Sequence, residues 1–320
     1  MAESKPITRL QVVVAFGLVY VLWGSTYIGI RLAVEHLPPL MMGGLRFIAS
    51  GALMLAFCVA RGTSIAVSGK QLFRLSIIGI LLLTTGNVVL GWAETKIPTS
   101  LAALLIAITP LWFLLLEKLS SHGDHISARG VVGIALGVLG VVVLLWPDFH
   151  TLNFRGGSLL GAPLVLFSSF SWASGSILTK RWHIDLDPYT SSGWQMLMAG
   201  LINGAMSLAV GDLHRTVWAR SSLLAVLYLV IAGSLIGFTA YVWLLRNVPT
   251  PKVATYAYVN PIVAVFLGWL ILGEKLTPYM MAGAVVIILS VVLVTGAKLK
   301  RRDAHTPADE ELAPIESAGD

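Results

Sequence analysis

The sequence predicts an all-α integral membrane protein whose ten transmembrane helices form two inverted five-helix repeats. Three observations predict this fold class: the composition, the apolar segments and an internal repeat. Of the 320 residues, 56% are hydrophobic and 12% are charged, and the mean hydropathy is +0.82. Because about a quarter of the residues in a soluble domain are charged, this composition indicates a chain that lies in a lipid bilayer.

Ten apolar segments are long enough to cross a bilayer, for which a helix needs roughly 20 mainly apolar residues. The first segment lacks a small-residue cleavage site, so we interpret it as a retained span and not as a signal peptide. The spans are expected at about 11–31, 40–60, 72–93, 98–117, 127–146, 158–179, 188–210, 222–245, 251–272 and 277–297. The predicted organisation is an N-terminus (1–10), a first half (11–146), a linker (147–157), a second half (158–297) and a disordered tail (298–320).

Basic residues in the loops predict the orientation of the chain. With the N-terminus inside, the cytoplasmic loops and ends carry fifteen Lys and Arg residues, and the outer loops carry six. An excess of Lys and Arg marks the cytoplasmic side. Both termini are therefore expected in the cytoplasm, and the protein is expected in the inner (plasma) membrane. We assign the formal net charge of +6 to contact with anionic lipid and not to nucleic acid.

The second half of the sequence repeats the first at offsets of 149 to 151 residues. Each half holds five spans, an odd number, so the second half must cross the membrane upside down. Inverted repeats with a site between the halves are typical of transporters; a channel can share this symmetry, whereas a receptor or an intramembrane enzyme has no need of it. The aligned pairs include Trp23 with Trp172, Gly51 with Gly200, Gly86 with Gly237, and Pro110 with Pro261.

The first span carries polar aromatic residues where lipid alone would favour Leu, Ile, Val and Phe. Trp23 and Tyr27 lie on one helical stripe, with the hydroxyl of Ser25 close by. Trp23 is about 18 Å into its span, whereas interfacial aromatic residues belong at the ends of a span. The stripe therefore either lines a solute cavity or packs against other helices.

Arg46 is the most unusual residue of the spans, because it lies about six residues inside the second one. A charge at this depth costs at least about 2.5 kcal/mol on insertion scales. Arg46 either extends its charge to the outer face or has a functional role, holding an anionic group of a substrate or pairing with Glu94. Glu94, at the end of the third span, is a gate, cation or proton site in one interpretation and an exposed acid beside Lys96 in the other.

Two prolines inside spans, Pro110 and Pro261, occupy matching positions in the two halves and predict helix kinks. Matched interruptions of this kind point to the substrate site of a transporter. We expect aromatic and amide side chains there, which bind amphipathic solutes by stacking and hydrogen bonding. The further residues of the predicted site are Asn87, Trp92, Trp172, Trp243, Tyr256, Tyr258 and Asn260.

Other motif searches exclude several classes of function. The sequence contains no phosphate-binding GxxxxGK[ST] motif, no serine nucleophile with a base in reach and no convincing metal-ligand set. We therefore expect no enzyme activity, no cofactor and no metal. The spacing of Gly133 and Gly137 suits helix packing within one chain or in a possible homodimer.

Two strings resemble the EamA-type, ten-helix branch of the drug/metabolite transporter superfamily: "WGSTYIGIR…PPLMMGGLRF" and "RNVPTPKVATYAYVNPIVAVFLGWLILGEKL". The likeness is closest to the YedA-like inner-membrane permeases and covers about residues 10–297. The resemblance implies ten helices around a central cavity and alternating access, usually in an exporter of small metabolites. We expect the export of an amino acid or related amphipathic compound; an uptake carrier, a channel and a membrane scaffold are the alternatives.

Overall fold

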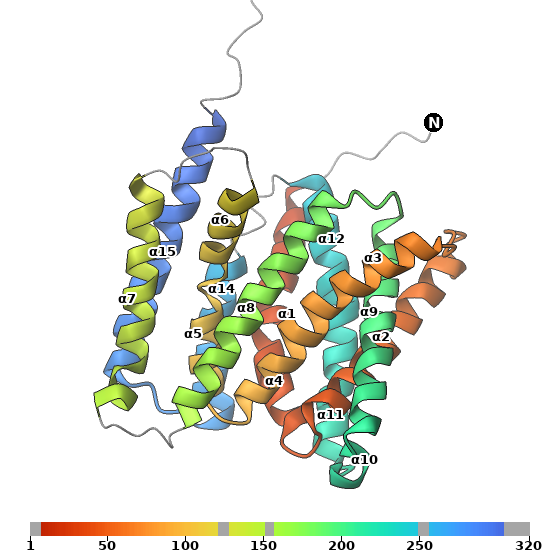
Figure 1. The fold of residues 1–320 in the computed structure, drawn as a ribbon, viewed down its shortest axis with the longest axis horizontal. Helices are drawn as coiled ribbons and strands as arrows, with labels where there is room; N and C mark the ends of the chain where they lie inside the picture. The colour runs from red at the N-terminus through yellow and green to blue at the C-terminus, as the bar shows by residue number, and fades with distance from the viewer. Residues whose placement is uncertain (1–7, 121–127, 151–156, 249–255, 304–320) are drawn as a thin grey trace, which may run out of the picture.

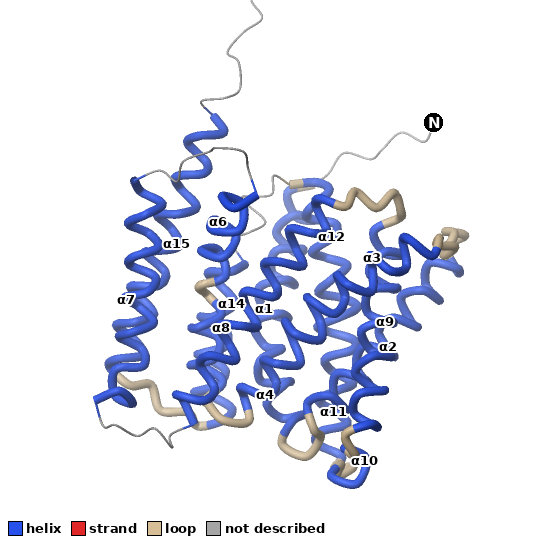
Figure 2. Tube along the Cα trace, viewed as in Figure 1, coloured by secondary structure: helices blue, strands red, loops and turns tan. Residues whose placement is uncertain are grey.

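The computed structural model describes residues 8–120, 128–150, 157–248 and 256–303, and Figure 2 shows that the regular elements in these ranges are all helical. Two of these elements, η1 and η2, are π-helices. In chain order, the elements are α1 (Arg9–Val34), α2 (Pro39–Ala60), α3 (Gly69–Gly79), η1 (Ile80–Val88), α4 (Val89–Glu94), α5 (Thr99–Ile106), α6 (Thr109–Ser120), α7 (Ala128–His150), α8 (Gly157–Arg181), α9 (Pro188–Ala209), α10 (Asp212–Arg215), α11 (Arg220–Tyr228), η2 (Leu229–Ile236), α12 (Gly237–Asn247), α14 (Tyr256–Leu272) and α15 (Pro278–Asp303).

Helices occupy all ten of the segments in which the sequence predicts spans. Within the described residues, seven helices are long and apolar enough to cross a membrane, and two shorter apolar helices, Val259–Leu272 and Pro278–Leu293, accompany them. α9 is not among the seven, although it has 22 residues. Its polar side chains lower its hydropathy, but they are buried and therefore do not meet lipid: Ser192, Gln195, Asn203 and Ser207 are at most 8% exposed.

The predicted boundaries between the halves and the tail shift in the structure. α7 extends to His150 and α8 begins at Gly157, so helix enters both ends of the predicted linker. α15 continues to Asp303, beyond the predicted start of the tail at residue 298. α1 begins and α15 ends on the same face of the molecule (Figure 1). We call this the terminal face and the opposite one the far face.

The third helix of each half contains a π-helix. η1 lies between α3 and α4, and η2 lies between α11 and α12. The two segments nearly coincide in the repeat, since Gly86 near the end of η1 aligns with Gly237 directly after η2. A π-helix is a rare, wider form of helix that occurs frequently at functional sites. The paired π-helices therefore make the region of η1 and η2 a candidate functional site.

The two prolines at matching positions differ in their effect on the helix. A turn at Ala107 and Ile108 separates α5 from α6 directly before Thr109 and Pro110. Pro261 lies inside α14, which continues through it without a break. The kink predicted at Pro261 stays a prediction, and the residues preceding Tyr256 are outside the described range.

The two halves interlock, because their largest helix contacts are between halves. α2 packs along α9, α7 along α15, and α1 along α14; α7 and α15 stand side by side at one edge in Figure 1. A Cβ atom on Gly51 would lie 2.4 Å from the Leu197 backbone nitrogen, and one on Gly200 would lie 2.4 Å from the Ile48 nitrogen. These repeat-related glycines let the backbones of α2 and α9 touch.

The glycine spacing on α7 is used within the chain. Ser290 on α15 donates a hydrogen bond of 2.7 Å to the Gly133 carbonyl. A Cβ atom on Gly137 would lie 2.9 Å from the Ser290 hydroxyl oxygen. These two glycines therefore hold α7 against α15, and they lend no support to a homodimer.

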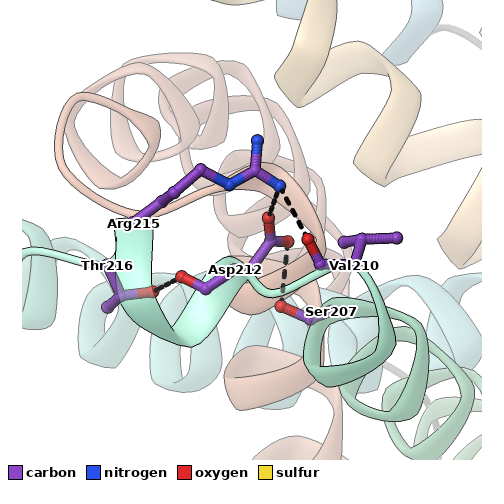
Figure 3. A network of polar contacts seen from close by, with 5 residues as sticks. All are labelled: Ser207, Val210, Asp212, Arg215 and Thr216. Atoms are coloured by element: carbon purple, nitrogen blue, oxygen red, sulfur yellow. Dashed lines mark hydrogen bonds and ion pairs between the residues drawn. The ribbon is translucent and has the colours of Figure 1, made fainter.

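A polar network at α10 fixes the chain between α9 and α11 on the far face (Figure 3). The buried Asp212 carboxylate accepts hydrogen bonds from Ser207 Oγ at 2.9 Å and from Arg215 Nη2 at 2.5 Å. Thr216 Oγ1 donates to the Asp212 carbonyl at 2.8 Å. Gly211 precedes this turn with φ of +75°, a conformation that glycine adopts without strain. The network explains how a short segment reverses the chain direction there.

Candidate functional site

Three aromatic rings meet where α1, α12 and α14 come together. The Trp23 ring lies 4.9 Å from that of Tyr241 and 5.2 Å from that of Tyr256, and the two tyrosine rings are 5.8 Å apart. Tilted and edge-to-face arrangements at these distances are favourable for aromatic pairs. The sequence predicts the roles of Trp23 and Tyr256, but it gives no sign that Tyr241 joins them.

The two aligned tryptophans make reciprocal contacts with the opposite half. Trp23 packs on Gly237: a Cβ atom added to Gly237 would lie 2.8 Å from Trp23 Nε1. Trp23 Nε1 also donates a hydrogen bond of 3.1 Å to the Gly233 carbonyl. Trp172 packs on Gly86, where a Cβ atom would lie 3.4 Å from its Cε3. Each tryptophan therefore lies beside the π-helix of the other half.

Arg46 joins these two π-helices. Its Nε donates to Ser234 Oγ of η2 at 3.2 Å, and its Nη1 donates to Asn87 Oδ1 of η1 at 3.0 Å. The guanidinium also lies 4.9 Å from the centre of the Phe47 ring. Arg46 is 6% exposed, so it does not extend its charge to the outer face. It also does not pair with Glu94, as one interpretation of the sequence proposed, because its partners are neutral.

These contacts form one continuous group of side chains, because Gly233 and Ser234 are adjacent, as are Gly86 and Asn87. We call the group the inter-half cluster. It contains Trp23, Arg46, Asn87, Trp172, Ser234, Tyr241 and Tyr256. It combines aromatic faces, an amide, a hydroxyl and one permanent positive charge, which are suited to bind an amphipathic solute.

Asn260 supports the cluster from α14. Its side-chain amide donates to the carbonyls of Tyr20 and Tyr256, each at 3.2 Å. The approach of α14 to α1 depends on Gly24, where a Cβ atom would lie 2.6 Å from Val263 Cβ. The amide thus joins α14 to α1 next to Tyr256.

Glu94 lies at the far-face end of α4 and is completely buried. Neither of its carboxylate oxygens has a hydrogen-bond partner among the described residues, and Arg31 donates instead to the Glu94 backbone carbonyl. Tyr27, one helix turn beyond Trp23 on α1, is buried as well. The interpretation of Glu94 as an exposed acid is therefore wrong.

A cavity of about 440 Å³ opens on the far face beside Glu94. It is lined by charged groups of both signs together with apolar residues: Arg31, Leu32, Glu35, Thr95, Lys96, Ile97, Pro98, Leu272 and Glu274. Glu274 accepts hydrogen bonds from the backbone nitrogens of Thr99 at 2.6 Å and Ser100 at 2.9 Å. A carboxylate at this position satisfies the free N–H groups of α5 and complements its dipole. It also ties the second half to the first.

Seven residues of the predicted site are not members of the inter-half cluster: Ser25, Tyr27, Trp92, Glu94, Trp243, Tyr258 and Asn260. Ser25 makes a 2.5 Å contact with the Tyr228 hydroxyl on α11, and Trp92 is 38% exposed. Trp243 packs against the same buried residues of α1 and α12, Val19 and Leu244 among them, on which Trp23, Tyr241 and Tyr256 also pack. The side chain of Tyr258 is outside the described residues. Helical periodicity alone does not reveal which face of α4 turns outward.

The cluster also contains two residues that the sequence does not predict, Tyr241 and Ser234. Tyr241 lies two residues before Trp243 on α12, and tryptophan is the stronger sequence signal of the two. Ser234 is a small residue in an apolar run, and no local pattern marks it. No group of three or more His, Cys, Asp or Glu in the described ranges is placed to hold a metal ion; His122, Asp124 and His125 lie outside those ranges.

Comparisons with known proteins agree with this architecture. Residues 11–146 and 159–296 each match the model of the EamA-like transporter family. The chain is 38% identical over 301 residues to the "Uncharacterized inner membrane transporter YedA" of Escherichia coli strain K12, with 92% of each chain covered. It is 27% identical over 304 residues to a "Probable amino-acid metabolite efflux pump" of Salmonella typhimurium strain LT2, covering 89% of this chain and 95% of that one.

A solved crystal structure is similar in fold, with a TM-score of 0.65 at 19% sequence identity. The superposition covers 93% of this chain and 100% of that chain. At this identity the likeness concerns the fold alone.

Proposed function

The chain belongs to the EamA-like transporter family, and we propose that it is an alternating-access secondary transporter of small organic solutes. The inter-half cluster carries this proposal. It places aromatic, amide and guanidinium groups where the two halves meet, at a π-helix from each half. A site between repeats, formed by irregular helices, is typical of secondary transporters.

In the proposed topology, ten spans form two inverted halves around a central path. The reciprocal contacts support it: Trp23 meets Gly237 as Trp172 meets Gly86, and Gly51 meets α9 as Gly200 meets α2. Contacts related in this way are expected of two repeats around a pseudo-twofold axis. The excess of Lys and Arg in the loops on the terminal face supports placing both termini in the cytoplasm.

The proposed substrate is an amino acid or a related amphipathic compound, and the proposed direction is export across a bacterial inner membrane. The names of the two relatives support the membrane and the solute class. The aromatic rings of Trp23, Tyr241 and Tyr256 suit an apolar body, and Arg46 and Asn87 suit a polar group. Glu94 and the far-face cavity would lie on the route between the cluster and the outside.

The proposed mechanism is a rocking of one half against the other about the inter-half cluster. Glu274 bonded to the start of α5 keeps the halves together on the far face in this conformation. Opening that face would require breaking these hydrogen bonds. A solute that contacts both halves at the cluster can favour one arrangement only if it binds that arrangement more tightly.

Solute counterflow in liposomes tests the proposal. Purified protein is first screened by thermal shift against amino acids, nucleosides and cationic drugs, and a stabilising solute is then radiolabelled. A carrier exchanges it across the membrane with saturation, whereas a channel shows conductance without saturation or counterflow. If Ala at Trp23, Asn87 and Tyr256 all left exchange unchanged at equal protein levels, the cluster would not be the site.

A further inference from the structure

Arg46 carries a permanent charge in the interior of the protein. It is the one buried basic side chain among the described residues, and a guanidinium is not deprotonated in proteins. Burying a charge is costly unless it is paired with a counter-charge and hydrogen-bonded. An anion is therefore expected near Arg46, either an acidic side chain of the protein or a bound ligand.

The protein itself provides none in the described residues. Asn87 Oδ1 and Ser234 Oγ are neutral acceptors, and Nη2 of Arg46 has no hydrogen bond there. Glu94 follows Asn87 by seven residues, about 10 Å along the helix, which is too far for an ion pair. Within the described ranges, the ion pair at 4.0 Å or less is that of Arg215 with Asp212, on the far face. The charge of Arg46 is thus left without compensation.

The position of this charge fits a ligand better than it fits a structural cross-link. Arg46 donates one hydrogen bond to η1 and one to η2, the π-helical segments of the two halves. Gly233 and Gly86, which precede its two partners, contact Trp23 and Trp172. A lone positive charge flanked by aromatic faces is complementary to a small molecule that has an anionic end and an apolar body.

We propose that Arg46 binds the carboxylate of the transported solute, with Asn87 and Ser234 as the residues that orient its guanidinium. This inference rests on the transport function proposed above. The solute class it specifies is a monocarboxylate with an apolar or aromatic body, which includes zwitterionic amino acids. One guanidinium balances one negative charge, whereas a dianionic phosphate group would need a second buried cation, and the described residues contain none.

Matched pairs of acids and amides test this assignment in liposome counterflow. The probes are L-tryptophan with L-tryptophanamide and indole-3-propionate with indole-3-propionamide; the second pair has no ammonium group. The protein is compared with Arg46→Gln, which retains hydrogen-bond donors, and with Arg46→Lys, which retains the charge. Arg74→Gln is the control, because Arg74 also donates to a carbonyl, that of Trp182 at 3.3 Å, and lies 5.7 Å from an aromatic ring centre.

We expect the wild type to prefer the acid of each pair by about 10- to 100-fold in half-saturating concentration, as for a hydrogen bond to a charged group. Arg46→Gln should lose this preference, Arg46→Lys should retain part of it and Arg74→Gln should retain all of it. If the wild type exchanges acids and amides equally, or Arg46→Gln keeps the preference, the assignment of Arg46 is wrong while transport stands. If the wild type exchanges none of the four probes, the proposed solute class fails as well.

Discussion

The contact between α2 and α9 makes a sharp prediction about Gly51→Ala. The new methyl group would start 2.4 Å from the Leu197 nitrogen and 2.7 Å from its Cα, whereas non-bonded carbon atoms normally lie about 3.5–4.0 Å apart. Both opposing atoms are backbone, so no side chain can turn away. The helices must therefore separate locally by about 1 Å, and a gap of that size forfeits up to about half of each affected dispersion contact.

We expect Gly51→Ala to lower the free energy of unfolding by about 3 kcal/mol, the upper end of the usual cost of overpacking. Gly200→Ala should cost about the same, because its Cβ would lie 2.4 Å from the Ile48 nitrogen. The double variant should cost less than the sum, since the first methyl group already separates the helices and so makes room for the second.

Unfolding by SDS in mixed micelles, followed by circular dichroism, measures these differences. Gly17→Ala is the matched control, because a Cβ there meets nothing within 4 Å and alanine favours a helix over glycine by up to about 1 kcal/mol. Gly17→Ala should therefore be as stable as the wild type or more so. If Gly51→Ala unfolded at the same SDS fraction as Gly17→Ala, the described approach of α2 to α9 would be wrong.

Three further predictions concern the cap of α5, the α10 network and the inter-half cluster. Glu274→Gln should lower stability by about 1–2 kcal/mol in the same SDS assay, because it removes a charge-assisted cap; unchanged stability would contradict the cap. Asp212→Ala should lower the free energy of unfolding by about 1–2 kcal/mol, because it leaves the buried Ser207 hydroxyl without its acceptor. Arg215→Gln should lower it by less than about 0.5 kcal/mol, since the Arg215 side chain is 64% exposed. Equal losses for the two variants in SDS unfolding would refute this ranking. Trp23→Phe should reduce solute exchange at least about fivefold through loss of its 3.1 Å hydrogen bond, and Trp92→Phe should leave exchange unchanged; the reverse order in liposome counterflow would remove Trp23 from the site.

Much of the fold could be predicted from the sequence, because a membrane helix needs a long apolar run and such runs can be recognised directly in the sequence. Helix is present in every predicted span, and the repeat aligned Gly51 with Gly200, which the structure places in equivalent contacts. The π-helices could not be predicted. "ILLLTTGNV" has the composition of an ordinary apolar helix, and nothing in it marks a wider turn.

The candidate site could be predicted only where a residue was itself unusual. Arg46 stood out because a charge in a span is costly, but its partners did not, since Ser234 lies 188 positions away in an unremarkable apolar segment. Trp92 was selected for its residue type, and its 38% exposure depends on which face of α4 turns outward. Pro261 does not interrupt α14, because a proline permits a break without requiring one.

The interlocking of the halves has a consequence for biosynthesis. A ribosome delivers α1 to α7 before α8, yet α2 packs along α9 and α7 along α15. Until the second half emerges, the glycine face of α2 meets only lipid, and Arg46 has no Ser234 to bond with. The nascent chain must therefore wait in the membrane with its main interfaces unformed. A truncated product that ends after α7 should accordingly be a substrate for membrane proteases and not a folded half.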